Sequence, residues 1–163
     1  MNAARIATRR LELVPSTPEE ARKQVASMSA SDRAQLSADW LERLRLTTTA
    51  DPWVLGFAMV DQAKREPVGT CGFKGPPDAN GTVEIAYGVA PEHQNLGYAT
   101  EAAGALVQFA FADTRVRVVC AHTLSEANAS ARVLVKCGFT AVGQVVDPED
   151  GLVWRWETIR ARH

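Results

Sequence analysis

One stretch restricts the fold more than any other: a run of alternating side chains followed, after a short loop, by a run with helical spacing. Val83, Ile85 and Tyr87 alternate with Glu84 and small residues, which is the period of a β-strand. Pro91 has no N–H to donate and should therefore end the strand. After residue 97 the apolar side chains recur on one helical face: Ala99, Ala102, Leu106, Phe109 and Ala110. The stretch predicts a strand over 82–89, a loop, and a helix over 97–113.

The loop between the predicted strand and helix can hold an anion without a charged side chain. The first N–H groups of a helix have no partner inside the helix and lie at the positive end of its dipole. A diphosphate can therefore bind to the backbone at this position. Gly97 permits a close approach to such a ligand, and Ala99 keeps the next turn small. The same residues also form an ordinary helix start, with Gly97 as a turn residue.

Patterning along the rest of the chain predicts a mixed α/β fold, because strands come in runs with helices inserted between them. Thr17, Pro18 and Glu20 form a capping-box signal for the first helix. The expected helices cover residues 18–29, part of 32–46, and 129–137. Further strands are expected at residues 5–14, 53–60, 67–73, 116–123 (a central strand), 139–146 and 152–158. Turns should lie at 125–128 and at the acidic hairpin tip, 147–151.

Length and charge set limits on the class of protein. The 163 residues predict one domain, residues 1–163. A net charge of −1 argues against nucleic acid as the main partner. We expect no membrane span, because no apolar run reaches 18 residues, and no secretory signal, because the first ten residues lack an apolar segment. Cys71, Cys120 and Cys137 have no CxxC spacing, so we expect three buried or half-buried thiols in a reducing cytoplasm.

Three segments resemble the GNAT superfamily of N-acetyltransferases. The order Gln94-x-x-Gly97-x-Ala99, after a strand that ends in Gly88 and Val89, resembles the acetyl-CoA loop of that family. The longer run YGVAPEHQNLGYATEA, with ATRRLELVPST before it and NASARVLVKCGF after it, resembles the branch that contains the ribosomal-protein N-terminal acetyltransferases. The resemblance extends over residues 8–156, and residues 21–52 match only loosely.

This resemblance implies a fold, a cofactor and binding residues. The implied fold is the acyl-CoA N-acyltransferase fold, with a central twisted, mostly antiparallel sheet of about six or seven strands and about four helices. Acetyl-CoA is the implied co-substrate. Its pantetheine arm would bind the backbone of Val89, whose N–H is also the oxyanion donor; otherwise Val89 is a core strand residue. Asn128, alternatively an ordinary N-cap, and Ser130 would contact coenzyme A at the last helix. The diphosphate would bind the loop residues Gln94, Asn95, Leu96, Gly97, Tyr98, Ala99 and Thr100.

Glu84 is the candidate base. Its neighbours Ala86 and Gly88 are small and leave room for a water or an amine. In many members of the branch the matching glutamate acts as a base through water; the alternative is a strand carboxylate that faces solvent or pairs with an arginine. Many relatives carry a tyrosine in the last helix that protonates the leaving thiolate, and Leu134 stands there in this sequence. No general acid is therefore assigned, although water, Tyr98 or Tyr87 remain open; Tyr87 should lie in the core and Tyr98 on the outer side of the helix start.

Other chemistries find little support in the sequence. His93, His122 and His163 have no partner at metal spacing, so no metal site is expected. The sequence has no Gly-x-Ser-x-Gly elbow and no Walker loop. Trp40 is either a packing residue or part of an acceptor pocket. We therefore predict an acetyl-CoA-dependent N-acetyltransferase that acts by direct attack of a primary amine, on a protein N-terminus or a small molecule. The alternative is a non-catalytic acyl-CoA binding or sensing module on the same fold, and either protein could be a monomer or a homodimer.

Overall fold

The computed structural model describes residues 5–34, 36, 38–124, 129–147 and 151–160. Within these residues the chain forms one sheet of eight strands in the order β1-β2-β3-β4-β5-β6-β8-β7. All neighbouring strands are antiparallel except β5 and β6, which are parallel. The mixed, mostly antiparallel sheet is confirmed, although the expected six or seven strands are too few. The strands are β1 (Ile6–Ala7), β2 (Leu11–Pro15), β3 (Phe57–Asp61), β4 (Glu66–Phe73), β5 (Thr82–Val89), β6 (Val118–Leu124), β7 (Thr140–Asp147) and β8 (Gly151–Ile159).

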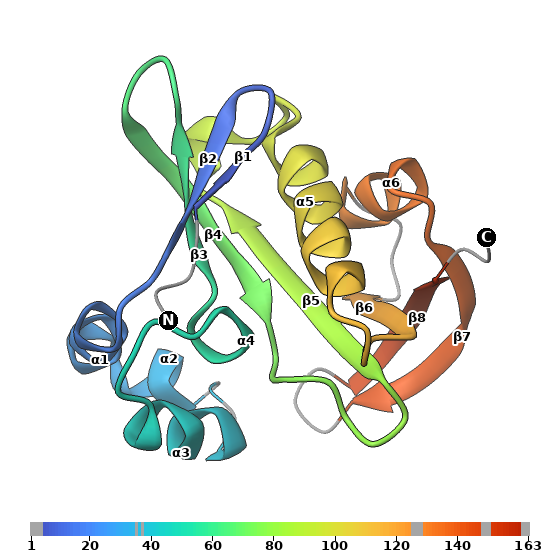
Figure 1. Cartoon of the computed structure of the whole chain (residues 1–163), viewed down its shortest axis with the longest axis horizontal. Coiled ribbons are helices and arrows are strands. Elements are labelled where there is room, and N and C mark those ends of the chain that lie inside the picture. The colour runs from blue at the N-terminus through green and yellow to red at the C-terminus, as the bar shows by residue number, and fades with distance from the viewer. Residues whose placement is uncertain (1–4, 35, 37, 125–128, 148–150, 161–163) are drawn as a thin grey trace.

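The described residues contain six α-helices, where about four were expected. Two of the six, α2 and α4, have only five and four residues. In Figure 1, α5 lies over β5 and β6, whereas α1, α2 and α3 gather at the lower left. None of these helices is long and apolar enough to cross a membrane. The helices are α1 (Pro18–Ser27), α2 (Ala30–Ala34), α3 (Ala38–Leu46), α4 (Pro52–Leu55), α5 (Tyr98–Ala112) and α6 (Ala129–Lys136), with a 3₁₀ turn, η1 (Pro91–His93), before α5.

The first predicted strand, residues 5–14, is only partly confirmed: residues 11–14 lie in β2, but the chain folds back before them as the hairpin β1–β2. The backbone N–H of Thr8 donates to the carbonyl of Leu11 (2.8 Å), which closes the turn. The carboxylate of Glu101 on α5 then accepts bonds from the hydroxyl of Thr8 (2.8 Å) and the backbone N–H of Arg10 (2.9 Å). A side chain about ninety residues away therefore fixes the turn, and local alternation does not reveal it.

The predicted strand over residues 53–60 is half wrong, since its first three residues belong to α4. The side chain of Asp51 accepts the backbone N–H of Trp53 (3.0 Å), and Pro52 occupies the first turn. These are ordinary helix-start signals. Gly56, with φ 67°, ends the helix, and β3 follows at once. The ring of Trp53 lies 4.6 Å from that of Phe73, which anchors α4 to the core.

One face of β5 packs against α5, as the two periodicities predicted. Val83 and Ile85 are buried on the strand, and Ala102, Leu106 and Ala110 are fully buried on the helix. The apolar stripe of α5 thus covers the alternating side chains of the strand, and removal of this surface from water stabilises both elements. The opposite face of β5, which carries Glu84, Ala86 and Gly88, is not covered by α5.

Two further predictions about the chain hold. Strand β6 lies between β5 and β8, so it is an interior strand as expected. Cys71 and Cys120 are buried free thiols and Cys137 is a half-buried one. The turn at residues 125–128 and most of the acidic tip, residues 148–150, lie outside the described residues.

Candidate functional site

A groove of about 760 Å³ lies on the face of β3, β4 and β5 that α5 does not cover. Its floor is made of small side chains that alternate with the buried ones along the strands, and it includes Glu84 and Lys74. Helices α1, α3 and α4 supply the walls, and Trp40 is one of the wall residues. The floor positions with small side chains are Ala58, Thr70, Gly72, Ala86 and Gly88.

Glu84 is half-buried at this groove and holds two partners through one oxygen. The ammonium of Lys74 lies 2.9 Å from Oε2 of Glu84. Nδ1 of His122 lies 2.9 Å from the same oxygen. An ionised carboxylate only accepts hydrogen bonds, so Nδ1 of His122 is the donor in that state. The arginine partner considered from the sequence is therefore replaced by a lysine and a histidine.

Sequence reasoning missed Lys74 as a partner and considered His122 only as a metal ligand. The backbone N–H of Lys74 donates to the carbonyl of Glu84 (2.9 Å), so the two residues face each other across the β4–β5 ladder. Strand β6 pairs Cys120 with Glu84, which places His122 two residues further along the same face. Neither relation can be read before the strand order and register are known. Among the described residues no group of three metal-ligating side chains is present.

Strand β5 changes its strand partner along its length. Its pairing with β6 extends over Thr82–Glu84, and the described residues contain no further pair between these strands. Pairing with β4 begins at Ile85 and extends to Val89. From Ile85 onward, one edge of β5 therefore faces a gap instead of a strand.

The backbone of Val89 points into this gap. Hydrogen-bonded pairs alternate with non-bonded pairs along an antiparallel ladder, and Ala90 donates to Val68 on β4 (2.9 Å). The residue before it, Val89, consequently directs its N–H and C=O away from β4. The side-chain amide of Gln94 donates to the carbonyl of Val89 (3.0 Å). The N–H of Val89 is the donor nearest the end of β5 that faces the gap.

The loop predicted to bind a diphosphate leads directly into α5. Gln94, Asn95, Leu96 and Gly97 are exposed, and Asn95 and Gly97 adopt left-handed backbone angles with φ 65° and 86°. Helix α5 begins immediately afterwards, and no side chain caps its first turn at Gly97. Ala99 and Thr100 are half-buried in that turn. Backbone N–H groups at this helix start are thus available to an anion.

Tyr98 does not lie on the outer side of the helix start, so that expectation is wrong. It is 5% exposed, and its hydroxyl donates to Oδ2 of Asp61 (2.6 Å). This hydrogen bond holds the pKa of the Asp61 carboxyl below its usual value and raises the pKa of Tyr98. The guanidinium of Arg10 covers the ring at 4.8 Å. Tyr98 therefore anchors the loop to β3, and only its backbone faces a ligand.

Helix α6 closes the same region from the other side. The hydroxyl of Tyr87, half-buried against the core as expected, donates to the carbonyl of the half-buried Ser130 (3.4 Å). The thiol of Cys137 donates to the carbonyl of Thr100 (3.5 Å). Asn128 lies outside the described residues. Leu134, which stands where many relatives have a tyrosine, is fully buried. The start of α6 therefore contacts the second half of β5, and the residue after the end of α6 contacts the start of α5.

The buried thiols are poor nucleophiles. Cys71, under the groove floor, has a pKa raised to about 12 by burial. Burial also raises the pKa of Cys120, next to Glu84 in the ladder, to about 11. Since the thiolate is the reactive form, neither group provides an activated nucleophile at neutral pH.

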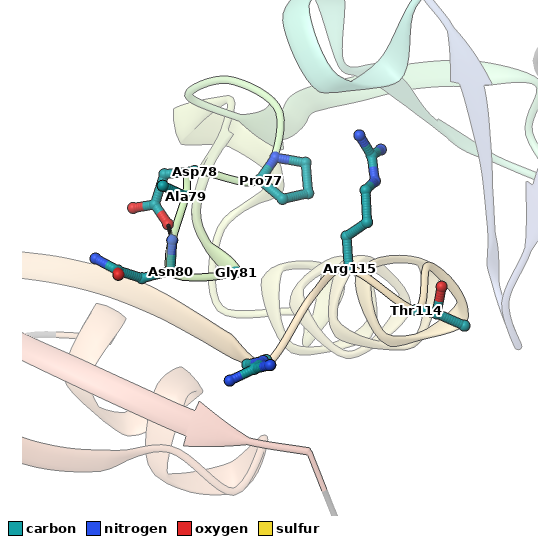
Figure 2. A pocket seen from close by; sticks show the side chains of 8 residues that line it. Pro77, Asp78, Ala79, Asn80, Gly81, Thr114 and Arg115 are labelled. Atoms are coloured by element: carbon teal, nitrogen blue, oxygen red, sulfur yellow. Dashed lines mark hydrogen bonds between the residues drawn. The ribbon is translucent and has the colours of Figure 1, made fainter.

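A second hollow, of about 430 Å³, lies before the start of β5. Figure 2 shows Pro77, Asp78 and their neighbours on one side and Arg115 on the other. Two of the charged groups here, Asp78 and Arg115, already have partners. Asp78 accepts the backbone N–H groups of Asn80 (2.8 Å) and Thr82 (3.0 Å). Arg115 pairs with Asp113 and, by its hydrogen bonds, lowers the pKa of that carboxyl to about 2. This hollow is accounted for by loop structure.

Comparison with known proteins agrees with this geometry. The model of an acetyltransferase (GNAT) domain matches residues 6–140. An uncharacterised N-acetyltransferase, YjdG, of Bacillus subtilis is 34% identical over 89 residues, which are 55% of this chain and 51% of the relative. The chain thus spans about half the length of that curated relative.

Two solved structures share the fold over nearly the whole chain. A putative ribosomal-protein-serine acetyltransferase from Vibrio cholerae has a TM-score of 0.69 and 19% identity, with 98% of this chain and 100% of the other covered. RimL, a ribosomal alpha-N-protein acetyltransferase in complex with coenzyme A, has a TM-score of 0.68 and 18% identity, with 96% and 98% covered.

Proposed function

Because the chain belongs to the GNAT acetyltransferase family, we propose that it moves the acetyl group of acetyl-CoA to a primary amine by direct attack. The carrying observation is the position of Glu84: it is the last residue of β5 that pairs with β6, and its side chain lines the groove. An amine in the groove would meet an acetyl group held in the gap beside Val89. The proposed proton acceptor, Glu84, thus lies at the end of the part of β5 that pairs with β6, and the proposed oxyanion donor, Val89, lies in the part beyond it.

In the proposed reaction, Glu84 is the base. The amine nitrogen forms the new C–N bond, the C–S bond of the thioester breaks, and the amine proton passes to Glu84 directly or through a water. Lys74 and His122 hold Oε2 of Glu84, so the carboxylate is fixed before the amine arrives, as a preorganised base requires. A protein α-amino group, with a pKa of about 8, demands less of this base than a lysine with a pKa of about 10.4.

The N–H of Val89 is the proposed donor to the developing oxyanion. The loop from Gln94 to Thr100 would hold the diphosphate of coenzyme A through its backbone. Ser130 would add a contact from α6, and the family resemblance implies one from Asn128. The leaving thiolate takes its proton from water, because the buried Leu134 has no proton to give. No covalent enzyme intermediate is needed, since the buried thiols are protonated at neutral pH.

The test is thermal unfolding of the protein with and without acetyl-CoA, with dephospho-CoA and ATP as controls. Ligand at one hundred times its dissociation constant stabilises a fold by about 2.7 kcal/mol. A shift with acetyl-CoA that exceeds the shift with ATP supports the proposal. No shift with acetyl-CoA, in a folded sample free of copurified coenzyme A, contradicts it.

One observation favours the non-catalytic alternative: Leu134 stands where many relatives have a tyrosine that acts as the general acid. An acyl-CoA binding module predicts stabilisation by acetyl-CoA without amine-dependent release of the coenzyme A thiol. A thiol reagent and a set of amines separate the two functions, since only an enzyme releases thiol faster when amine is added. Three free cysteines also favour a location in the cytoplasm, which is part of the same proposal.

A further inference from the structure

The walls of the groove point to the kind of amine that it accepts. We infer that the acceptor carries one amine on an apolar or aromatic skeleton, rather than a chain of several amines. This inference rests on the proposed acetyltransferase function and concerns only the acceptor half of the site. Five half-buried apolar side chains face the groove from the helical side: Val25, Met28, Leu36, Trp40 and Leu55.

Trp40 is the largest of these wall residues and is fixed in place. Its indole N–H donates to the carbonyl of Val54 (2.5 Å), so the one polar atom of the ring is satisfied inside the protein. The rest of the ring is an apolar surface that is already positioned. A preorganised aromatic surface of this kind favours a ligand with an apolar body, because little side-chain freedom is lost on binding.

The charges along the groove suit a single amine. The acidic side chains among its lining residues are Glu20 and Glu84, and Lys74 is the basic one. Lys74 is paired with Glu84, and Glu20 accepts the hydroxyl of Thr17 (2.9 Å) in the first turn of α1. A net single negative charge therefore remains along the lining. A polyamine would place a second and a third ammonium against apolar walls, where an unpaired charge is costly.

The floor leaves space for the acceptor skeleton. A side chain at Gly88 would meet no other atom within 4 Å, which shows open volume directly above β5. The groove volume of about 760 Å³ is within the range of small-molecule sites. The same chemistry is presented by a free arylalkylamine and by a peptide N-terminus with an apolar first residue.

The experiment measures amine-dependent thiol release from acetyl-CoA with three probes: 2-phenylethylamine, L-phenylalaninamide and spermidine. We expect kcat/KM for at least one of the two aromatic amines to exceed that for spermidine by about tenfold or more. Preference for L-phenylalaninamide would identify a peptide N-terminus as the source, and preference for 2-phenylethylamine a free amine. Release with spermidine alone overturns the inference but leaves the proposed function standing.

Two variants test the assignment within the groove. Trp40→Ala should raise KM for the preferred aromatic amine by about tenfold. Leu46→Ala is the control, because Leu46 lies on the same helix but is 63% exposed and outside the groove. This control should not raise KM. A larger rise for Glu20→Gln than for Trp40→Ala overturns the inference. If Trp40→Ala does not fold, the three-probe comparison on the unmodified protein still decides. Failure of the proposed function is recognised separately, as no thiol release with any amine, whether or not acetyl-CoA stabilises the fold.

Discussion

Strand β5 is built differently in its two halves. Its first three residues, Thr82–Glu84, pair with β6, and we call them the paired half. Ile85–Val89 pair with β4, and their other edge has no strand partner among the described residues, so we call them the open half. The sequence alternates in the same way through both halves, so the change is made by the divergence of β6.

The difference shows how one strand can carry both rigid and ligand-accessible groups. Glu84 lies where the two ladders meet: it pairs with Cys120 on β6, and its carbonyl accepts the backbone N–H of Lys74, which follows β4. Contacts on both edges suit the positioning of its side chain. In the open half, the N–H of Val89 points away from β4 toward an edge without a strand partner among the described residues. The proposed pantetheine arm would supply an acceptor for that N–H.

Removal of the carboxylate in the paired half should have the largest effect. Glu84→Gln keeps the size of the side chain but cannot take up a proton, and loss of a general base lowers turnover by about 10²–10⁴-fold. Stabilisation by acetyl-CoA should be retained, because the cofactor is proposed to bind the open half. The measurement is thiol release with a fixed amine.

Glu157→Gln is the matched control for this change. Glu157 lies on β8, paired with Arg155 at 2.7 Å and without a contact to Glu84 among the described residues. It should lose little activity. If Glu84→Gln is as active as the unmodified protein, Glu84 is not the base, although the enzyme assignment stands.

A side chain placed in the open half should block the acceptor. Gly88→Val adds a branched side chain where no atom lies within 4 Å of the new Cβ, and valine suits a strand. The fold should tolerate it, while kcat/KM for the amine falls by about tenfold to a hundredfold through lost positioning of the reacting amine. Gly104→Ala on α5, another position with open space, is the control. Unchanged kcat/KM in Gly88→Val would show that the amine does not pass over the floor.

A substitution in the loop that follows the open half should weaken acetyl-CoA binding and lower the stability of the fold. Gly97 has φ 86°, and a Cβ there would lie 2.8 Å from a guanidinium nitrogen of Arg10. Gly97→Val should weaken acetyl-CoA binding by about tenfold through crowding of the anion-binding backbone. It should also strain the loop by about 1–3 kcal/mol, more than the sequence alone suggests. Titration of acetyl-CoA with a parallel unfolding scan measures both; unaltered affinity would mean that the diphosphate binds elsewhere.

The sequence predicted best what local periodicity determines. The strand over Thr82–Val89 and the helix from Tyr98 to Ala112 were found because alternation and helical spacing each depend on neighbouring residues. Helix α4 was missed although its signal is local: Asp51 and Pro52 form a helix start that an apolar run concealed. The β1–β2 turn could not be found, because Glu101 fixes it from another element.

The candidate site also combines features that depend on neighbouring residues with features that depend on distant ones. Glu84 was selected because small residues flank it in the sequence. Its partners Lys74 and His122 depend on the register of β4 and β6, which no local pattern specifies. The inward turn of Tyr98 likewise depends on Asp61, a residue that lies outside the strands predicted over 53–60 and 67–73.

The smallest effect is expected away from β5, just after α5, where the carboxylate of Asp113 serves the fold. The pKa of Asp113 is lowered to about 2, first by the hydrogen bonds from Arg115. A carboxyl with a lowered pKa stabilises the folded state above its unfolded pKa of about 3.9, and this contribution is lost as pH falls toward 2. Asp113→Asn should therefore lower the unfolding midpoint at pH 7 by at most about 3 °C, since the pair is exposed.

The same variant should flatten the dependence of the unfolding midpoint on pH between about 4 and 2, without a change in thiol release at pH 7. Unfolding scans of the two proteins across that range make the measurement. Parallel curves would show that Arg115 does not perturb Asp113. A loss of thiol release at pH 7 would instead connect the Asp113–Arg115 pair to the chemistry and contradict a role in the fold alone.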